Sequence, residues 1–151
     1  MGEHASRVER LRADPAVTAM LERICDITTM GFAAVARVTD TQWIACQVVD
    51  RIEFGLEAGE ELALKTTICD EIRGSGRAVI IDTVSGNPDW RTHPTPMLYG
   101  FESYISFPIR LPDGTFFGTL CAIDPQPRSI GTPAIAALFE RFAAEIGALL
   151  A

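Results

Sequence analysis

The chain has 151 residues, 48% of them hydrophobic and 22% charged, which is enough apolar material for one folded domain. Aspartate and glutamate outnumber lysine and arginine by 20 to 13, so the formal net charge is −7. Nucleic acids and anionic membrane surfaces both attract basic proteins, so this balance argues against both kinds of partner. The sequence contains neither an apolar run of membrane-spanning length nor a secretory h-region, and we expect a cytoplasmic protein.

The four cysteines lie far apart, at Cys25, Cys46, Cys69 and Cys121. No CxxC or CxH spacing occurs among them, which disfavours a zinc site. In a reducing compartment they are expected to be small buried hydrophobic residues, with a redox or covalent-attachment role as the alternative.

Residues 1–14 are expected to form an N-terminal extension, and a first helix is predicted directly after it. Asp14 is a good N-cap and Pro15 suits the first helical position. Gly31 is expected to stop this helix. The apolar residues at helical spacing are Val17, Met20, Leu21, Ile24, Cys25 and Ile27.

Strands are predicted next, over 32–39 and 42–50, and the short turn at Asp40 and Thr41 favours an antiparallel hairpin. Residues 51–60 read as a third short strand or a loop. Residues 60–73 fit a short helix that closes on the glycines at 74 and 76.

The segment 78–83 is predicted to be a strand, and its apolar run over 78–81 predicts a central position or cover on both faces. Residues 84–102 combine prolines, glycines and aromatic residues in one long irregular stretch, and such stretches are usually functional.

A second hairpin is predicted over 103–110 and 115–124, with Gly114 supplying the positive φ of its turn. Gly118 indicates a bulge or the close approach of another element. Thr132 and Pro133 then cap a last apolar helix. The order of elements predicts an α+β fold with an antiparallel sheet.

Two segments carry a family resemblance: TTICDEIRGSGRAVIIDT (66–83) and SYISFPIRLPDGTFFGTLCAID (103–124). They resemble the GAF family of sensory domains over residues 15–151, most of all the modules placed ahead of histidine kinases and diguanylate cyclases. The positions that match the family pattern are Pro108, Gly114, Gly118, Leu120 and Asp124.

The resemblance implies a cup in which the sheet forms the base and residues 84–102 form a lid over a small-molecule pocket. The alternative is that aromatic side chains fill the cup and leave no room for a ligand. The candidate pocket residues are Cys69, Asp70, Trp90, His93, Tyr99, Phe101, Tyr104, Ser106 and Cys121.

Chromophore-binding GAF domains are one alternative class, but the stretch around His93 has no cysteine that could attach a bilin. Haem would require His93 as its axial ligand. The Asn-Lys-x-x-Phe-x-x-x-Asp-Glu signature of cyclic-nucleotide GAF domains is not present. We therefore expect no cofactor.

An enzyme of the free methionine-R-sulfoxide reductase type is a further alternative. Cys69 matches one cysteine position of those enzymes, but the nucleophilic lid cysteine has no counterpart. We therefore expect a regulatory domain without catalysis, which binds a small molecule or partner and signals to a kinase or cyclase. The alanine-rich last helix, together with the first, is expected to form a homodimer.

Overall fold

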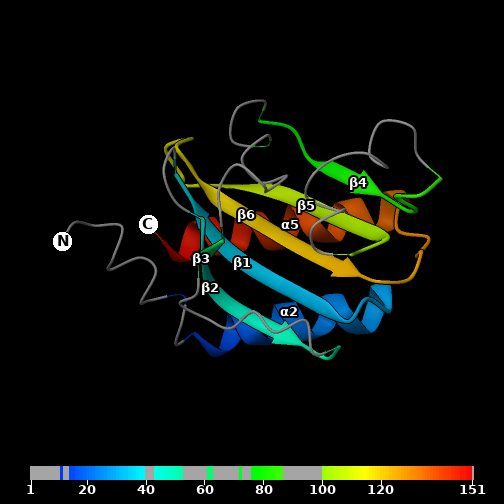
Figure 1. The fold of residues 1–151 in the computed structure, drawn as a ribbon. Helices are drawn as coiled ribbons and strands as arrows, with labels where there is room; N and C mark the ends of the chain where they lie inside the picture. Colours follow the sequence, from blue (N-terminus) through cyan, green and yellow to red (C-terminus); the bar gives the residue numbers. More distant parts are fainter. Residues whose placement is uncertain are drawn as a thin grey trace.

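The computed structural model describes residues 11, 14–39, 43–52, 61–62, 72, 76–86 and 100–150, which build an α+β fold around one antiparallel sheet (Figure 1). Six strands lie in the order β3-β2-β1-β6-β5-β4 among these residues. The elements are α2 (Pro15–Thr28), β1 (Phe32–Val38), β2 (Trp43–Asp50), β3 (Glu61–Leu62), β4 (Val79–Ile81), β5 (Ser103–Arg110), β6 (Phe116–Asp124) and α5 (Pro133–Leu149).

Both helices begin at the predicted caps. The Asp14 carboxylate accepts a hydrogen bond from the amide of Ala16, and the Thr132 hydroxyl accepts one from the amide of Ile135. A proline follows each cap at the start of the helix. Local sequence therefore determines where both helices begin.

The end of α2 differs from the prediction at Gly31. The helix ends at Thr28, and Thr29 is the C-cap in the left-handed conformation, with φ of 61°. Gly31 is required by space instead, because a Cβ at this position would overlap the side chain of Ile52.

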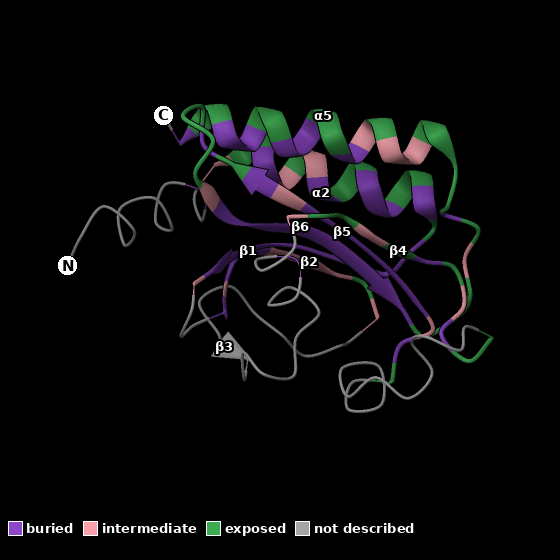
Figure 2. Cartoon of the chain, turned by 90° about the horizontal axis from the view of Figure 1, so that it is seen from above, coloured by how far each residue is buried: buried purple, intermediate pink, exposed green. Residues whose placement is uncertain are grey.

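The two helices cover one face of the sheet, and the core lies between them and the strands (Figure 2). The rings of Phe107 on β5 and Phe139 on α5 pack with their centroids 5.6 Å apart. Gly147 lets α5 come close to β5, since a Cβ there would overlap the carbonyl oxygen of Arg110. No helix in the described part of the chain is long and apolar enough to cross a membrane.

Both predicted hairpins are antiparallel, as expected. Gly114 has φ of +90° in the β5–β6 turn. At Gly118 a Cβ would overlap the carbonyl oxygen of Ala36 on β1, and the β5–β6 register shifts between Ile109 and Arg110. The prediction of a bulge or a close backbone approach is confirmed at this glycine.

Three sequence predictions were wrong. Glu61–Leu62 pairs with β2 as strand β3, so the predicted helix over 60–73 does not begin at residue 60, although Ile72 near its predicted end is helical. β4 is an edge strand, and its Ile80 is 37% exposed, although the run is wholly apolar. The alternation of apolar and polar residues over 103–110 predicts a strand buried on one face, but β5 is buried on both, since Tyr104 is 4% exposed and Ser106 is as inaccessible as Ile105. An apolar pattern reports burial but does not specify which neighbours a strand has.

Candidate functional site

The face of the sheet opposite the two helices is a candidate site. Cross-strand pairing brings Ala34 next to Cys121 and Cys121 next to Ser106, and Ala36 next to Thr119. We call this surface the floor. Each of its side chains is at most 6% exposed. The floor comprises Phe32, Ala34, Ala36, Val38, Trp43, Ala45, Tyr104, Ser106, Thr119, Cys121 and Ile123.

The floor has small side chains in its centre and large side chains at both ends. Its central rows carry alanine, serine, threonine and cysteine. Phe32, Ile123 and Tyr104 form one end, where Phe101 stacks on Tyr104 with ring centroids 5.3 Å apart. Trp43 forms the other end, paired with Val38. Six residue steps along β1 separate the two ends, which corresponds to about 20 Å.

Trp43 carries an unsatisfied polar atom within this apolar surface. Its side chain is 3% exposed, and its Nε1 is buried without a hydrogen-bond partner among the described residues. Buried polar atoms of this kind are rare in folded proteins.

Four of the nine predicted site residues lie in or beside this floor. Tyr104, Ser106 and Cys121 belong to it, and Phe101 packs against its end. The other five, Cys69, Asp70, Trp90, His93 and Tyr99, lie outside the described residues. Trp43 was missed at the sequence level. Trp43 and Ala45 are two residues apart on β2 and therefore share a face of the sheet, and Ala45 pairs with Ala36. The period-2 pattern of this strand is the signal that could have found Trp43.

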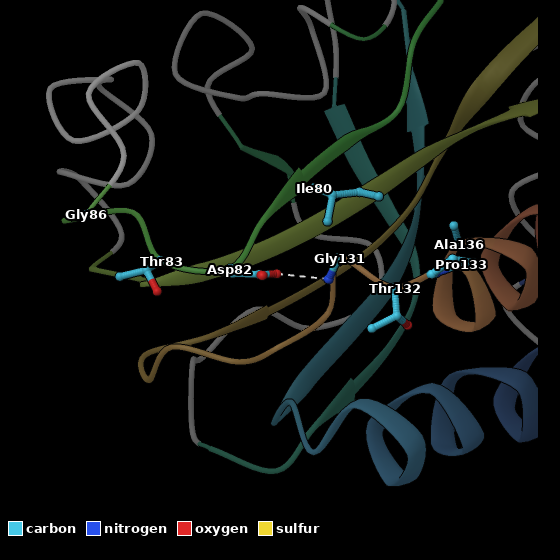
Figure 3. Close-up of a pocket in the computed structure, with 8 residues that line it drawn as sticks. All are labelled: Ile80, Asp82, Thr83, Gly86, Gly131, Thr132, Pro133 and Ala136. Atoms are coloured by element: carbon cyan, nitrogen blue, oxygen red, sulfur yellow. Dashed lines mark hydrogen bonds between the residues drawn. The ribbon is translucent and has the colours of Figure 1, made fainter.

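The floor is connected to the start of α5 through β4. Ile81 is 1% exposed and pairs with Tyr104, so it borders the floor. The next residue, Asp82, accepts a hydrogen bond at Oδ1 from the amide of Ile130 at 3.0 Å. The same oxygen accepts a second one from the amide of Gly131 at 2.9 Å (Figure 3). We call this arrangement the Asp82 clasp. It fixes the segment directly before α5 to the end of β4.

An open pocket of about 710 Å³ lies beside the clasp, between β4 and the first turn of α5 (Figure 3). The Asp82 carboxylate already accepts from the amides of Ile130 and Gly131, which lie just before the N-terminus of α5, the positive end of its helix dipole. It would repel a further anion, so the pocket lacks the chemistry of a phosphate site. Its lining consists of Ile80, Asp82, Thr83, Gly86, Gly131, Thr132, Pro133 and Ala136.

A second carboxylate, Asp124, stabilises the same region from inside. It is 2% exposed and accepts hydrogen bonds from the amides of Gly31 and Gln126 and from Nη2 of Arg128. These bonds satisfy a buried charge and connect the end of α2 to the segment that leads to α5. Asp124 is thus a structural residue.

The three described cysteines are buried, as predicted, and form no disulfide. Burial raises the pKa of Cys46 to about 12 and also raises the pKa of Cys25. Both thiols belong to the core on the helix side of the sheet, away from the floor. Neither has the low pKa that a nucleophilic thiolate requires.

Comparison with known proteins agrees with this architecture. The type II free methionine-R-sulfoxide reductase of Thermoplasma acidophilum superposes with a TM-score of 0.70 at 14% identity, covering 95% of this chain and 94% of that one. The GAF domain of a two-component sensor histidine kinase from Bacillus halodurans gives 0.67 at 10%, covering 91% and 92%. The PixJ GAF domain of Thermosynechococcus elongatus, in its blue-light-absorbing form, gives 0.67 at 13%, covering 98% and 86%.

These similarities concern the fold, which serves sensors, photoreceptors and an enzyme. No curated protein sequence matches the chain. The sequence model of the GAF domain matches residues 13–150, nearly the full length. The chain therefore belongs to the GAF domain family.

Proposed function

We propose that this chain is a sensory GAF domain in which a small molecule or partner occupies the floor and the signal leaves through α5. The observation that carries the proposal is the covalent and hydrogen-bonded path from the floor to that helix. Ile81 borders the floor, and the adjacent Asp82 holds the two amides before α5. A shift of β4 would therefore move the start of the helix.

The mechanism is a change in a conformational equilibrium. A ligand that prefers one position of β4 would favour the corresponding position of α5, by no more than its difference in affinity for the two states. In a longer signalling protein, α5 would pass the change to an output module such as a histidine kinase or a diguanylate cyclase.

Pairing of two copies through α2 and α5 belongs to the same proposal. Ile27 on α2 is 44% exposed and Leu149 on α5 is 40% exposed. The outward side of α5 also carries Ala137, Ala144 and Ala148. Small side chains let a second helix approach closely, and an apolar helix face is stabilised by such a partner.

We assign the domain a regulatory rather than a catalytic role. The reductase chemistry of a GAF-fold enzyme would require a reactive thiolate facing the floor. Cys25 and Cys46 have raised pKa values and lie on the opposite side of the sheet. Cys121 is the one described cysteine on the floor, and it is buried in an apolar cluster, where cysteines are usually inert.

A thermal-shift screen of amino acids, nucleotides and aromatic metabolites tests the proposal. A molecule that binds the floor should raise the melting temperature of the wild type. It should lose this effect in Ala34→Leu, which adds bulk at the centre of the floor, and keep it in Ala137→Leu, on the exposed side of α5. A ligand whose effect survives Ala34→Leu in a folded variant would contradict floor binding.

A further inference from the structure

A second cavity, of about 400 Å³, lies between α5, the second half of β5 and the residues just before β4. Its base is apolar, because Phe107 is 7% exposed, Ala143 is 6% exposed and Pro108 is half-buried beside them. Phe107 and Ala143 belong to the core on the helix side of the sheet, so this cavity is separate from the floor. Its volume falls in the range of roughly 300–1,000 Å³ that small-molecule sites occupy.

Arg110, at the end of β5, gives the cavity a positive charge that the backbone holds in place. Its Nη2 donates a hydrogen bond to the carbonyl oxygen of Gly76 at 3.0 Å. Gly76 has φ of +70°, and a Cβ at this position would lie 3.0 Å from the same nitrogen. The other N–H groups of the guanidinium have no partner among the described residues, so they are available to a carboxylate.

Glu140, on α5, gives the same cavity a negative charge. Its side chain is exposed, and its carboxylate makes no hydrogen bond or ion pair with any residue that the structure describes. Glu140 and Arg110 line one cavity from two different elements without pairing with each other. Two opposite charges in this arrangement leave room between them for a molecule that carries both signs.

A ligand with a carboxylate, an ammonium group and an apolar body matches the three features of this cavity. A carboxylate can bind a guanidinium through two parallel hydrogen bonds, and an ammonium group pairs with the carboxylate of Glu140. The apolar body would cover Phe107 and Pro108 and remove their exposed surface from water. Each charge of the ligand would then have a counter-charge, which a charged group beside an apolar surface requires.

We propose that this cavity binds a free α-amino acid with an apolar side chain, its carboxylate on Arg110, its ammonium group on Glu140 and its side chain against Phe107. The ligand would connect the end of β5 to the middle of α5. The inference goes beyond the proposed function, because this site is separate from the floor and does not depend on a floor ligand.

Four probes test the inference. L-Leucine carries all three features, L-leucinamide lacks the carboxylate, 4-methylpentanoate lacks the ammonium group, and glycine lacks the apolar side chain. Binding to the full chain is measured by NMR titration, in which the backbone amides of Phe107 and Ala143 report whether a probe occupies this cavity.

Two variants each remove one charge from the cavity, Arg110→Gln and Glu140→Gln. Both positions are exposed, so both variants should fold. The matched controls are Arg23→Gln on α2 and Glu145→Gln on α5, which change exposed residues outside the cavity.

In the wild type, L-leucine should bind about two- to fivefold more tightly than L-leucinamide and than 4-methylpentanoate, as one exposed ion pair provides. Glycine should bind more weakly than leucine because it leaves Phe107 uncovered. Leucine should lose its advantage over leucinamide in Arg110→Gln and its advantage over 4-methylpentanoate in Glu140→Gln. Both advantages should persist in the two control variants.

The possible failures are distinguishable. Equal binding of leucine and either analogue to the wild type overturns the zwitterionic ligand class, as does an advantage that survives the matching variant. If no probe binds, the whole inference fails. Leucine binding that is lost in a folded Ala34→Leu variant would place the amino acid on the floor, which contradicts this site and supports the proposed function. If leucine binds here while the thermal-shift screen finds no floor ligand, the proposed function fails and this inference stands.

Discussion

Replacing Asp82 by alanine should loosen the start of α5 without unfolding the domain. The substitution removes the carboxylate that accepts from the amides of Ile130 and Gly131, while the Ile130 amide keeps its second acceptor, the carbonyl of Arg128. The backbone carbonyl of Asp82, which accepts from the amide of Arg128, remains. The variant therefore tests the clasp and leaves the path of the chain intact.

The expected magnitude follows from the two lost bonds. Hydrogen bonds to charged groups contribute about 1.5–3 kcal/mol each, but the exposed carboxylate of Asp82 is also solvated by water, which lowers the net value. We expect a total loss of about 2 kcal/mol, equivalent to a roughly 30-fold larger equilibrium constant for local opening. Asp82→Asn retains an acceptor oxygen and should lose about half as much.

Amide hydrogen exchange measured by NMR at Ile130 and Gly131 reports this opening directly. Asp113→Ala is the matched control, because Asp113 is an exposed carboxylate that accepts from the amide of Thr115 in the β5–β6 turn. It should leave exchange before α5 unchanged. Equal exchange at Ile130 and Gly131 in the wild type and in Asp82→Ala would refute the clasp as the connection between β4 and α5.

Three further predictions concern the thiols, the assembly and the absence of a chromophore. Burial keeps the pKa of Cys46 at about 12 against an ordinary value of 9.0, so the unfolded chain loses this proton first. The free energy of unfolding should then fall by about 1.4 kcal/mol per pH unit above pH 9. Denaturant titrations at several pH values should show a shallower fall in Cys46→Ala than in the wild type. Equal slopes in the two proteins would contradict the raised pKa. Light scattering should give a dimeric mass for the wild type and a monomeric one for Ala144→Glu, whereas a monomeric wild type at micromolar concentration would refute pairing. The purified protein should show no absorption band above that of its aromatic residues, and a Soret band lost in His93→Ala would contradict this expectation.

The start of each element could be predicted where the cause is local. Each helix begins where an N-cap residue is followed directly by a proline. These pairs are Asp14 with Pro15 and Thr132 with Pro133. The turn at Gly114 needs a positive φ, which few residues other than glycine adopt readily. These features depend on neighbours within a few residues, so the sequence shows them directly.

The position of β4 could not be predicted in the same way. Its apolar run suggested a central strand, yet the sheet ends at β4 and Ile80 is exposed. Strand order is decided by which distant segments pair, and hydrophobicity alone does not encode it.

The candidate site was predicted in part for a similar reason. Tyr104, Ser106 and Cys121 were found from the resemblance of the second hairpin to the family pattern, and the structure places them on one face. The Asp82 clasp joins Asp82 to two residues that follow it by 48 and 49 positions in the sequence, so no local spacing reveals it. Trp43 looks like any strand tryptophan in the sequence, and only the structure shows that its Nε1 is buried without a partner among the described residues.

The central claim is that occupancy of the floor changes the start of α5 through the Asp82 clasp. The most direct measurement is hydrogen–deuterium exchange across residues 128–136, with and without a saturating floor ligand from the thermal-shift screen, in the wild type and in Asp82→Ala. We predict that the ligand changes exchange in the wild type and that this change is lost in Asp82→Ala, although the ligand still binds. An exchange rate that the bound ligand leaves unchanged in the wild type would contradict the claim.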